Sequence, residues 1–238
     1  MSIFGAEVIG TAILILLGDG VVAATLLNHS KAQNGGWIVI AWGWGIAVAM
    51  AVFAVGQFDG AHLNPAVTMG FAVIGNTKWA DVPKYIGGEF VGAFIGAVLV
   101  FGAYSNHWRA TEDPGLKLAV FSTAPAIRNT IANFITEVIG TFVLVFGVLA
   151  IFADKATAAT GLGALLVGLL VLGIGLSLGG PTGYAINPAR DLGPRIAHAL
   201  LPIPGKGPSD WGYAWIPVLA PLAGGTLGAL CFDWWFPG

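Results

Sequence analysis

The chain has 238 residues, of which 56% are hydrophobic and 9% are charged, and its formal net charge is −2. Because an ordinary soluble domain has about 25% charged residues, this composition excludes a typical water-soluble protein and indicates a membrane protein. The small net charge says little about partners, and we predict no nucleic-acid partner.

Six apolar stretches are long enough to cross a hydrocarbon core of about 30 Å. In chain order they are 3–27, 36–56, 83–104, 129–153, 161–178 and 214–236. Two shorter apolar stretches, at about 65–75 and 188–201, can cross only half of such a core. A cleaved signal peptide is the alternative for the first stretch, but Met1 and Ser2 supply no basic segment and Glu7 interrupts the apolar run.

The chain contains an internal repeat. The letters EVIGT at 7–11 recur at 137–141, and Asn-Pro-Ala occurs at 64–66 and again at 187–189. Each half holds three full spans before the pattern repeats. Because three is an odd number of crossings, the second half enters the membrane from the opposite face, which predicts an inverted repeat.

We therefore expect a single membrane channel domain. Its first repeat covers about 1–104 and its second about 129–238, and a polar linking loop at about 105–128 joins them outside the bilayer. Small residues spaced four apart on the third span of each half predict close helix packing. They are Gly88, Gly92 and Gly96, and Ala220, Gly224 and Gly228.

Each Asn-Pro-Ala triplet has the features of a helix start. Asn is a favoured N-cap and Pro is favoured at the first helical position, so Asn64 and Asn187 each begin a short helix. In an inverted repeat the two starts meet at the bilayer centre. The irregular chain before each, at 56–63 and 179–186, is tolerated there only if it lines a wet cavity.

The two helix starts also predict how charge is handled at the centre. Each N-terminus carries about half a positive charge, which opposes cations and protons. The amides of Asn64 and Asn187 would orient an entering water and interrupt proton transfer along a file of waters. The alternative is that both asparagines are only N-caps in a buried bundle.

The segments GAHLNPAVT at 60–68 and GYAINPARD at 183–191 resemble the aquaporin superfamily, the major intrinsic proteins. The resemblance covers essentially the whole chain, and Asp191 resembles the glycerol-facilitator branch. It implies an all-α, right-handed bundle of six transmembrane helices plus two half-helices. It also implies a homotetramer with one pore per subunit, placed in the cell membrane among lipid, with both termini in the cytoplasm.

The family's narrowest point is a ring of four positions, which fall here on Trp44, Gly175, Tyr184 and Arg190. By this resemblance Arg190 holds hydroxyls and repels cations, while Trp44 and Tyr184 offer an aromatic wall to carbon atoms. Gly175 leaves the room that carbons need. Tyr184 replaces the Phe of well-known glycerol facilitators, and its hydroxyl either narrows the ring or adds a hydrogen-bond partner.

Other polar residues, Asp191 among them, are candidates for lining or supporting the pore. Glu7 and Glu137 are expected, as in the family, to hold loop carbonyls toward the pore, with a proton relay as the alternative. His62 and Leu63 are expected to line the pore, and a pH sensor is the alternative for His62. Asp19 is a candidate residue of the outer vestibule, because it falls near the end of the first span, where ionisable groups mark functional sites.

The predicted function is a passive channel for glycerol and other small uncharged solutes, with water, that excludes protons and ions. Undissociated lactic acid, dihydroxyacetone and urea are further candidate solutes. The alternative is an ion-coupled secondary transporter, since inverted repeats also build those. An enzyme lacks support because no nucleophile, base and metal set is present. The single Cys231 forms no internal disulfide, and we predict no metal and no cofactor.

Overall fold

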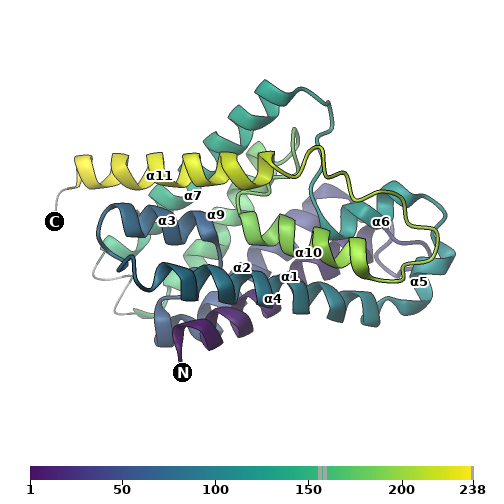
Figure 1. Ribbon diagram of the computed structural model, residues 1–238, viewed down its shortest axis with the longest axis horizontal. Coiled ribbons are helices and arrows are strands. Elements are labelled where there is room, and N and C mark those ends of the chain that lie inside the picture. Colours follow the sequence, from purple (N-terminus) through teal and green to yellow (C-terminus); the bar gives the residue numbers. More distant parts are fainter. Residues whose placement is uncertain (155–156, 158–159, 237–238) are drawn as a thin grey trace.

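A computed structural model describes residues 1–154, 157 and 160–236, and these residues form helices and loops without a strand. Residue 238, the predicted end of the second repeat, lies outside the described part. The helices shown in Figure 1 are α1 (Ile3–Leu26), α2 (Gly36–Asp59), α3 (Pro65–Val73), α4 (Val82–Ala103), α5 (Ser105–Ala110), α6 (Pro114–Phe121), α7 (Thr130–Ala153), α9 (Gly163–Leu178), α10 (Pro188–Leu200) and α11 (Ile216–Trp235).

Among the described residues, five helices are long and apolar enough to cross a membrane: α1, α2, α4, α7 and α11, with 20 to 24 residues each. They confirm five of the six predicted spans. The sixth, α9, is shorter than predicted, because its 16 residues extend about 24 Å. Gly161 explains the difference: its φ of 73° is left-handed, and a right-handed helix cannot run through that conformation.

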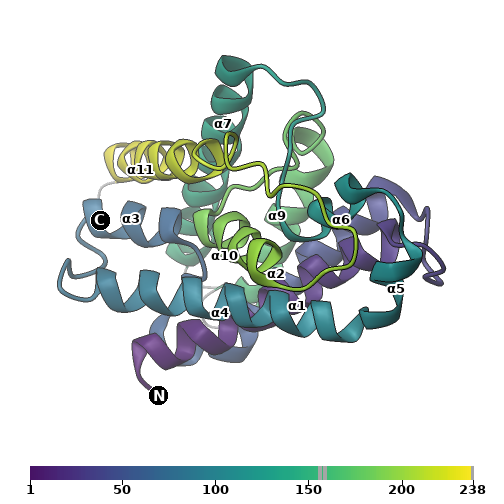
Figure 2. The ribbon, with the colours of Figure 1, turned by 45° about the vertical axis from the view of Figure 1, so that its right-hand side comes forward.

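Both short helices form where the sequence predicted them. The Asn64 side chain accepts a hydrogen bond from the Ala66 N–H and caps α3, and Asn187 caps α10 through the Ala189 N–H. In Figure 1 the two helices follow one another along the long axis. Figure 2 shows α10 near the middle of the molecule, where it contacts α4, α6 and α11.

The two halves repeat one helix contact. Helix α1 packs on α4, and α7 packs on α11. A Cβ atom added at Gly92 would lie 2.5 Å from the Val8 carbonyl oxygen, and one added at Gly224 would overlap the Val138 carbonyl oxygen. Val8 and Val138 hold the same place in the two EVIGT segments. Glycine is therefore required twice, at equivalent points, for the helices to approach closely.

The segment 105–128 differs from the predicted linking loop, because it contains α5 and α6. Asp113 accepts a hydrogen bond from the Gly115 N–H with Pro114 at the first helical position, and these are ordinary helix-start signals. Trp108 and Phe121 are fully buried. The segment is thus packed into the bundle rather than held away from it.

Candidate functional site

A cavity of about 800 Å³ lies between the two halves of the chain. Its wall includes Trp44, His62, Leu63, Asn64, Tyr184, Asn187 and Arg190 from the predicted site. Much of the remaining wall is apolar, as at Leu14, Val52, Leu144, Val148 and Val171. The predicted residues that do not line it are Glu7, Asp19, Glu137, Gly175 and Asp191. A largely apolar cavity with a few placed polar groups suits a small solute.

The two asparagines are tied to each other's half of the chain. Asn64 Nδ2 donates to the Ile186 carbonyl oxygen at 2.8 Å, and Asn187 Nδ2 donates to the Leu63 carbonyl oxygen at 2.8 Å. Their Oδ1 atoms accept from the helices that they cap. Since a primary amide has two N–H donors, each asparagine keeps one for the cavity, so their role extends beyond capping.

The loops before the asparagines share an unusual backbone. Ala61 and Leu63 have φ of 52° and 55°, and Tyr184 and Ile186 have φ of 39° and 43°. In each loop, these residues lie three positions and one position before the asparagine. Left-handed backbone at residues other than glycine costs about 1–3 kcal/mol each, so each loop needs contacts that hold it.

Glu7 supplies those contacts in the first half. Its Oε1 accepts from the His62 N–H and its Oε2 from the Leu63 N–H, both at 2.7 Å, and the residue is fully buried. In a trans peptide the N–H and the preceding C=O point in opposite directions. The Ala61 and His62 carbonyls therefore point away from Glu7.

Glu137 repeats this arrangement in the second half. Its carboxylate accepts from the Ala185 N–H at 2.9 Å and from the Ile186 N–H at 2.8 Å. The Tyr184 and Ala185 carbonyls point away from it for the same reason. Both loops lie on the cavity wall, so the two glutamates act on the cavity through backbone and contribute none of its surface.

Arg190 lies at the cavity wall against an aromatic ring. Its Cζ is 4.1 Å from the centre of the Trp44 ring, a cation–π distance. A Cβ atom at Gly18 would overlap the same ring, so glycine there makes room for Trp44. Arg190 Nη1 donates to the Phe121 carbonyl oxygen at 3.2 Å.

Gly175 makes room for the Tyr184 side chain, and its place in the narrow ring of the pore stays a prediction. A Cβ atom there would lie 2.8 Å from Tyr184 Cζ and 2.9 Å from its Oη, and Gly175 does not line the cavity. The space over the glycine is filled by the Tyr184 side chain. The Tyr184 hydroxyl is buried without a hydrogen-bond partner among the described residues.

Asp19, the candidate residue of the outer vestibule, is buried beside Arg190. Its side chain is 0% exposed, and its Oδ1 lies 3.3 Å from Arg190 Nη1. Helix α1 presents Asp19 toward Arg190, which lies in the first turn of α10. Sequence reasoning found the residue as an ionisable group in an apolar span but missed its partner.

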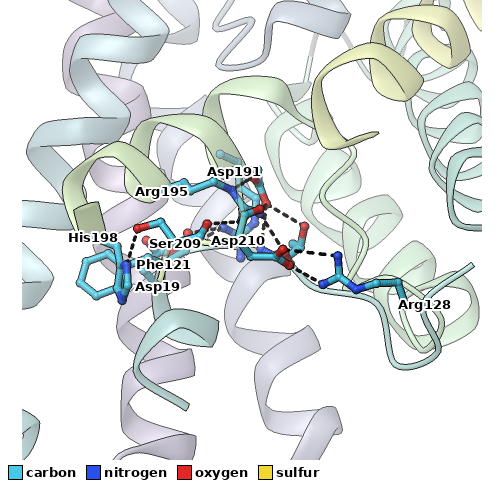
Figure 3. Close-up of polar contacts among 10 residues, drawn as sticks. Asp19, Phe121, Arg128, Asp191, Arg195, His198, Ser209 and Asp210 are labelled. Atoms are coloured by element: carbon cyan, nitrogen blue, oxygen red, sulfur yellow. Dashed lines mark hydrogen bonds and ion pairs between the residues drawn. The ribbon is translucent and has the colours of Figure 1, made fainter. Parts of the chain in front are cut away.

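Asp191 fastens α10 to the segment that follows α6. Its Oδ2 accepts from the Thr123 N–H at 2.8 Å and from the Thr123 hydroxyl at 2.7 Å. Its Oδ1 accepts from Arg195 Nε at 2.8 Å, and both charged side chains are 0% exposed. Figure 3 shows this pair together with Asp19 and Phe121. Phe121 and Thr123 act partly through backbone atoms, which no sequence pattern singled out.

Further side-chain bonds around this pair hold the neighbouring loops against α10. Arg195 Nη1 donates to the Ser209 carbonyl oxygen at 2.8 Å. The exposed Arg128 forms a hydrogen-bonded ion pair with Asp210 (Figure 3). This contact raises the pKa of the Arg128 guanidinium. The residues near Arg190 are therefore held by side-chain bonds from several loops.

His62 reaches the cavity with a defined orientation. Its Nδ1 lies 2.9 Å from Thr68 Oγ1, and that hydroxyl donates to Glu89 Oε1 at 2.7 Å. His62, Thr68 and Glu89 therefore form a chain of hydrogen bonds that holds the ring in place. The ring also stacks on Tyr85 with centroids 4.0 Å apart.

A bundle of long apolar helices, with two half-helices meeting at asparagines beside a mostly apolar cavity, defines a membrane transport protein built from an inverted repeat. Residues 2–232 match the model of the Major intrinsic protein family. The chain belongs to this family and is a multi-pass membrane protein.

Named relatives extend over the whole chain. It is 60% identical over 236 residues to a probable glycerol uptake facilitator protein of Thermotoga maritima, covering 99% of this chain and 100% of that one. It is 56% identical over 238 residues to the glycerol uptake facilitator protein of Bacillus subtilis, covering 100% and 86%. The solved aquaglyceroporin of Plasmodium falciparum is 30% identical, with a TM-score of 0.85 and coverage of 97% and 94%. These relatives indicate a transport protein rather than an enzyme.

Proposed function

We propose that the protein is a passive channel for glycerol and other small uncharged solutes, together with water. The observation that carries the proposal is the two-sided wall of the cavity. Apolar side chains form much of it, whereas the loops before Asn64 and Asn187 add backbone carbonyls and amide N–H groups. A polyol has the same division, with C–H groups on one side and hydroxyls on the other.

The carbonyls that point away from Glu7 and Glu137 are acceptors for solute hydroxyls. The free N–H groups of the asparagines, and those of Arg190 beyond Nη1, are donors. Acceptors and donors then alternate along the wall, so a hydroxyl can change partners without losing all of them. The names of the relatives support glycerol as one such solute.

The same wall opposes ions and protons. The N-termini of α3 and α10 direct partial positive charge at the centre, and Arg190 adds a cation on the wall. A cation entering there would give up part of its hydration shell, and the positive wall would not compensate for that loss. A water bound between Asn64 and Asn187 would accept from both amides, which orients it against proton transfer.

In this proposal Asn64 and Asn187 form the centre of the pore, and Trp44, Tyr184 and Arg190 form its narrow part. The repeats are the segments before and after about 105–128, within one channel domain. We further propose a homotetramer in the cell membrane with both termini in the cytoplasm. Support for this assembly comes from family membership and from the many exposed apolar side chains on the outside of the bundle.

The test is glycerol entry into proteoliposomes, followed by stopped-flow light scattering. Wild-type protein should give fast entry with low activation energy and no dependence on an ion gradient, compared with empty liposomes. Accumulation driven by a proton or sodium gradient would favour the coupled transporter and overturn the channel. Undissociated lactic acid, dihydroxyacetone and urea, offered in the same assay, would define the range of solutes.

A further inference from the structure

The buried ion pair between α1 and α10 is not explained by packing alone. Asp19 is an acid within an apolar helix, and its side chain is 0% exposed. Its Oδ1 faces Arg190 Nη1 at 3.3 Å, whereas its Oδ2 has no hydrogen-bond partner among the described residues. A buried charge is retained only where a partner compensates it, and here that partner lies on the cavity wall.

The hydrogen bonds of Arg190 divide its guanidinium into a held side and a free side. Nη1 has two N–H groups, and it donates to Asp19 and to the Phe121 carbonyl oxygen. The flat face rests on Trp44. Nε and Nη2 make no recorded hydrogen bond in the described part of the chain and belong to a residue that lines the cavity. Asp19 therefore determines which N–H groups remain for a solute.

Charge balance gives Asp19 a second effect. The other buried acid nearby, Asp191, is matched by Arg195 at 2.8 Å. Asp19 is thus the carboxylate that matches Arg190. Without it, the cavity wall would carry the full positive charge of Arg190, which would attract anions more strongly.

We propose that Asp19 is a positioning residue of the pore: it fixes the Arg190 guanidinium and offsets part of its charge, so that a solute meets aligned N–H donors on a wall that still opposes cations but holds small anions weakly. The inference rests on the proposed function, because it concerns the same pore. Its consequence is that small anions, which could form paired hydrogen bonds with an arginine, do not occupy the site and block neutral solutes.

The variant Asp19→Asn tests the proposal. Asn keeps an oxygen for Nη1, and its amide nitrogen takes the place of the unpartnered Oδ2. Formate is the probe, since it is small, planar and ionised at neutral pH. With sodium formate in place of sodium gluconate at equal ionic strength, we expect half-inhibition of glycerol entry in Asp19→Asn at a concentration at least about tenfold lower than in wild type. Asp19→Glu should restore the wild-type response.

The matched control is Asp81→Asn, which also removes one acid. Asp81 pairs with exposed Lys84 before α4, away from the cavity wall, so its response to formate should equal that of wild type. If Asp19→Asn does not fold, Asp19→Ser applies the same test, because its hydroxyl can still accept from Nη1.

A second readout does not depend on transport. Formate should raise the unfolding temperature of purified Asp19→Asn and leave that of wild type unchanged. If wild type conducts no glycerol, the proposed function fails, and the unfolding measurement still decides the role of Asp19. Equal formate responses of wild type, Asp19→Asn and Asp19→Ser in this measurement would overturn the role of Asp19, whatever the glycerol result.

Discussion

Replacing Glu137 by Gln should release the loop before Asn187. The carboxylate accepts one N–H on each oxygen, whereas a Gln amide has a single acceptor oxygen and would turn its NH₂ toward a backbone N–H. Losing one hydrogen bond to a charged group and leaving a buried N–H unpaired costs about 2–4 kcal/mol. That is comparable with the cost of the left-handed Tyr184 and Ile186, about 1–3 kcal/mol each.

The loop then loses the contact that offsets its own strain. A change of 2 kcal/mol alters a conformational ratio about thirtyfold, so glycerol entry per channel should fall by as much as about thirtyfold. The unfolding temperature of the purified protein should fall as well. Both quantities can be measured on one preparation, by stopped-flow light scattering and by thermal unfolding.

Glu89→Gln is the matched control, because Glu89 is also a fully buried glutamate. It accepts from the Thr68 hydroxyl through Oε1, and its Oε2 has no partner among the described residues. Its amide variant loses at most one hydrogen bond of about 1 kcal/mol. Wild-type flux and stability in Glu137→Gln, or an equal loss in Glu89→Gln, would refute the reasoning.

Three further outcomes follow from the contacts of single residues. Tyr184→Phe removes a buried, unpartnered hydroxyl, so stability should stay equal or rise by about 1 kcal/mol with glycerol entry unchanged, as thermal unfolding and flux would show. Gly92→Ala places a Cβ atom 2.5 Å from a carbonyl oxygen and should lower the free energy of unfolding by about 1–3 kcal/mol. Its control is Gly20→Ala, which should cause no loss, because a Cβ atom at Gly20 has nothing within 4 Å. Equal unfolding temperatures of the two variants would contradict this. Arg190→Ala should weaken cation exclusion, which current recordings in oocytes would detect; unchanged exclusion would mean that the helix N-termini suffice.

The half-helices were predictable because their signals are local. Asn64 and Asn187 are N-caps followed by Pro at the first helical position, and both helices begin there. The repeated EVIGT segments placed Glu7 and Glu137 at matching points. Cap preferences depend on three or four neighbouring residues, so no tertiary information was needed.

The contacts that the sequence did not reveal join residues far apart in the chain or separated by a loop. Asp19 and Arg190 are 171 positions apart, and only the rotation of α1 relative to α10 brings their side chains together. Gly175 was assigned to the pore ring by resemblance to the family, and its contact with the Tyr184 ring depends on the path of the loop between them, which no residue pattern describes. The helices within 105–128 were missed for another reason: polar residues were given more weight than the start signals at Asp113 and Pro114.

The crossed bonds from Asn64 to Ile186 and from Asn187 to Leu63 have a consequence for the order of folding. Each half donates the bond that completes the loop of the other, so neither loop can reach its final state alone. During synthesis, the Asn64 amide and the Leu63 carbonyl of the first half lack these hydrogen-bond partners until the second half is inserted. The last step in forming the cavity is then the meeting of the two halves, and a defect in either one leaves both loops unfinished.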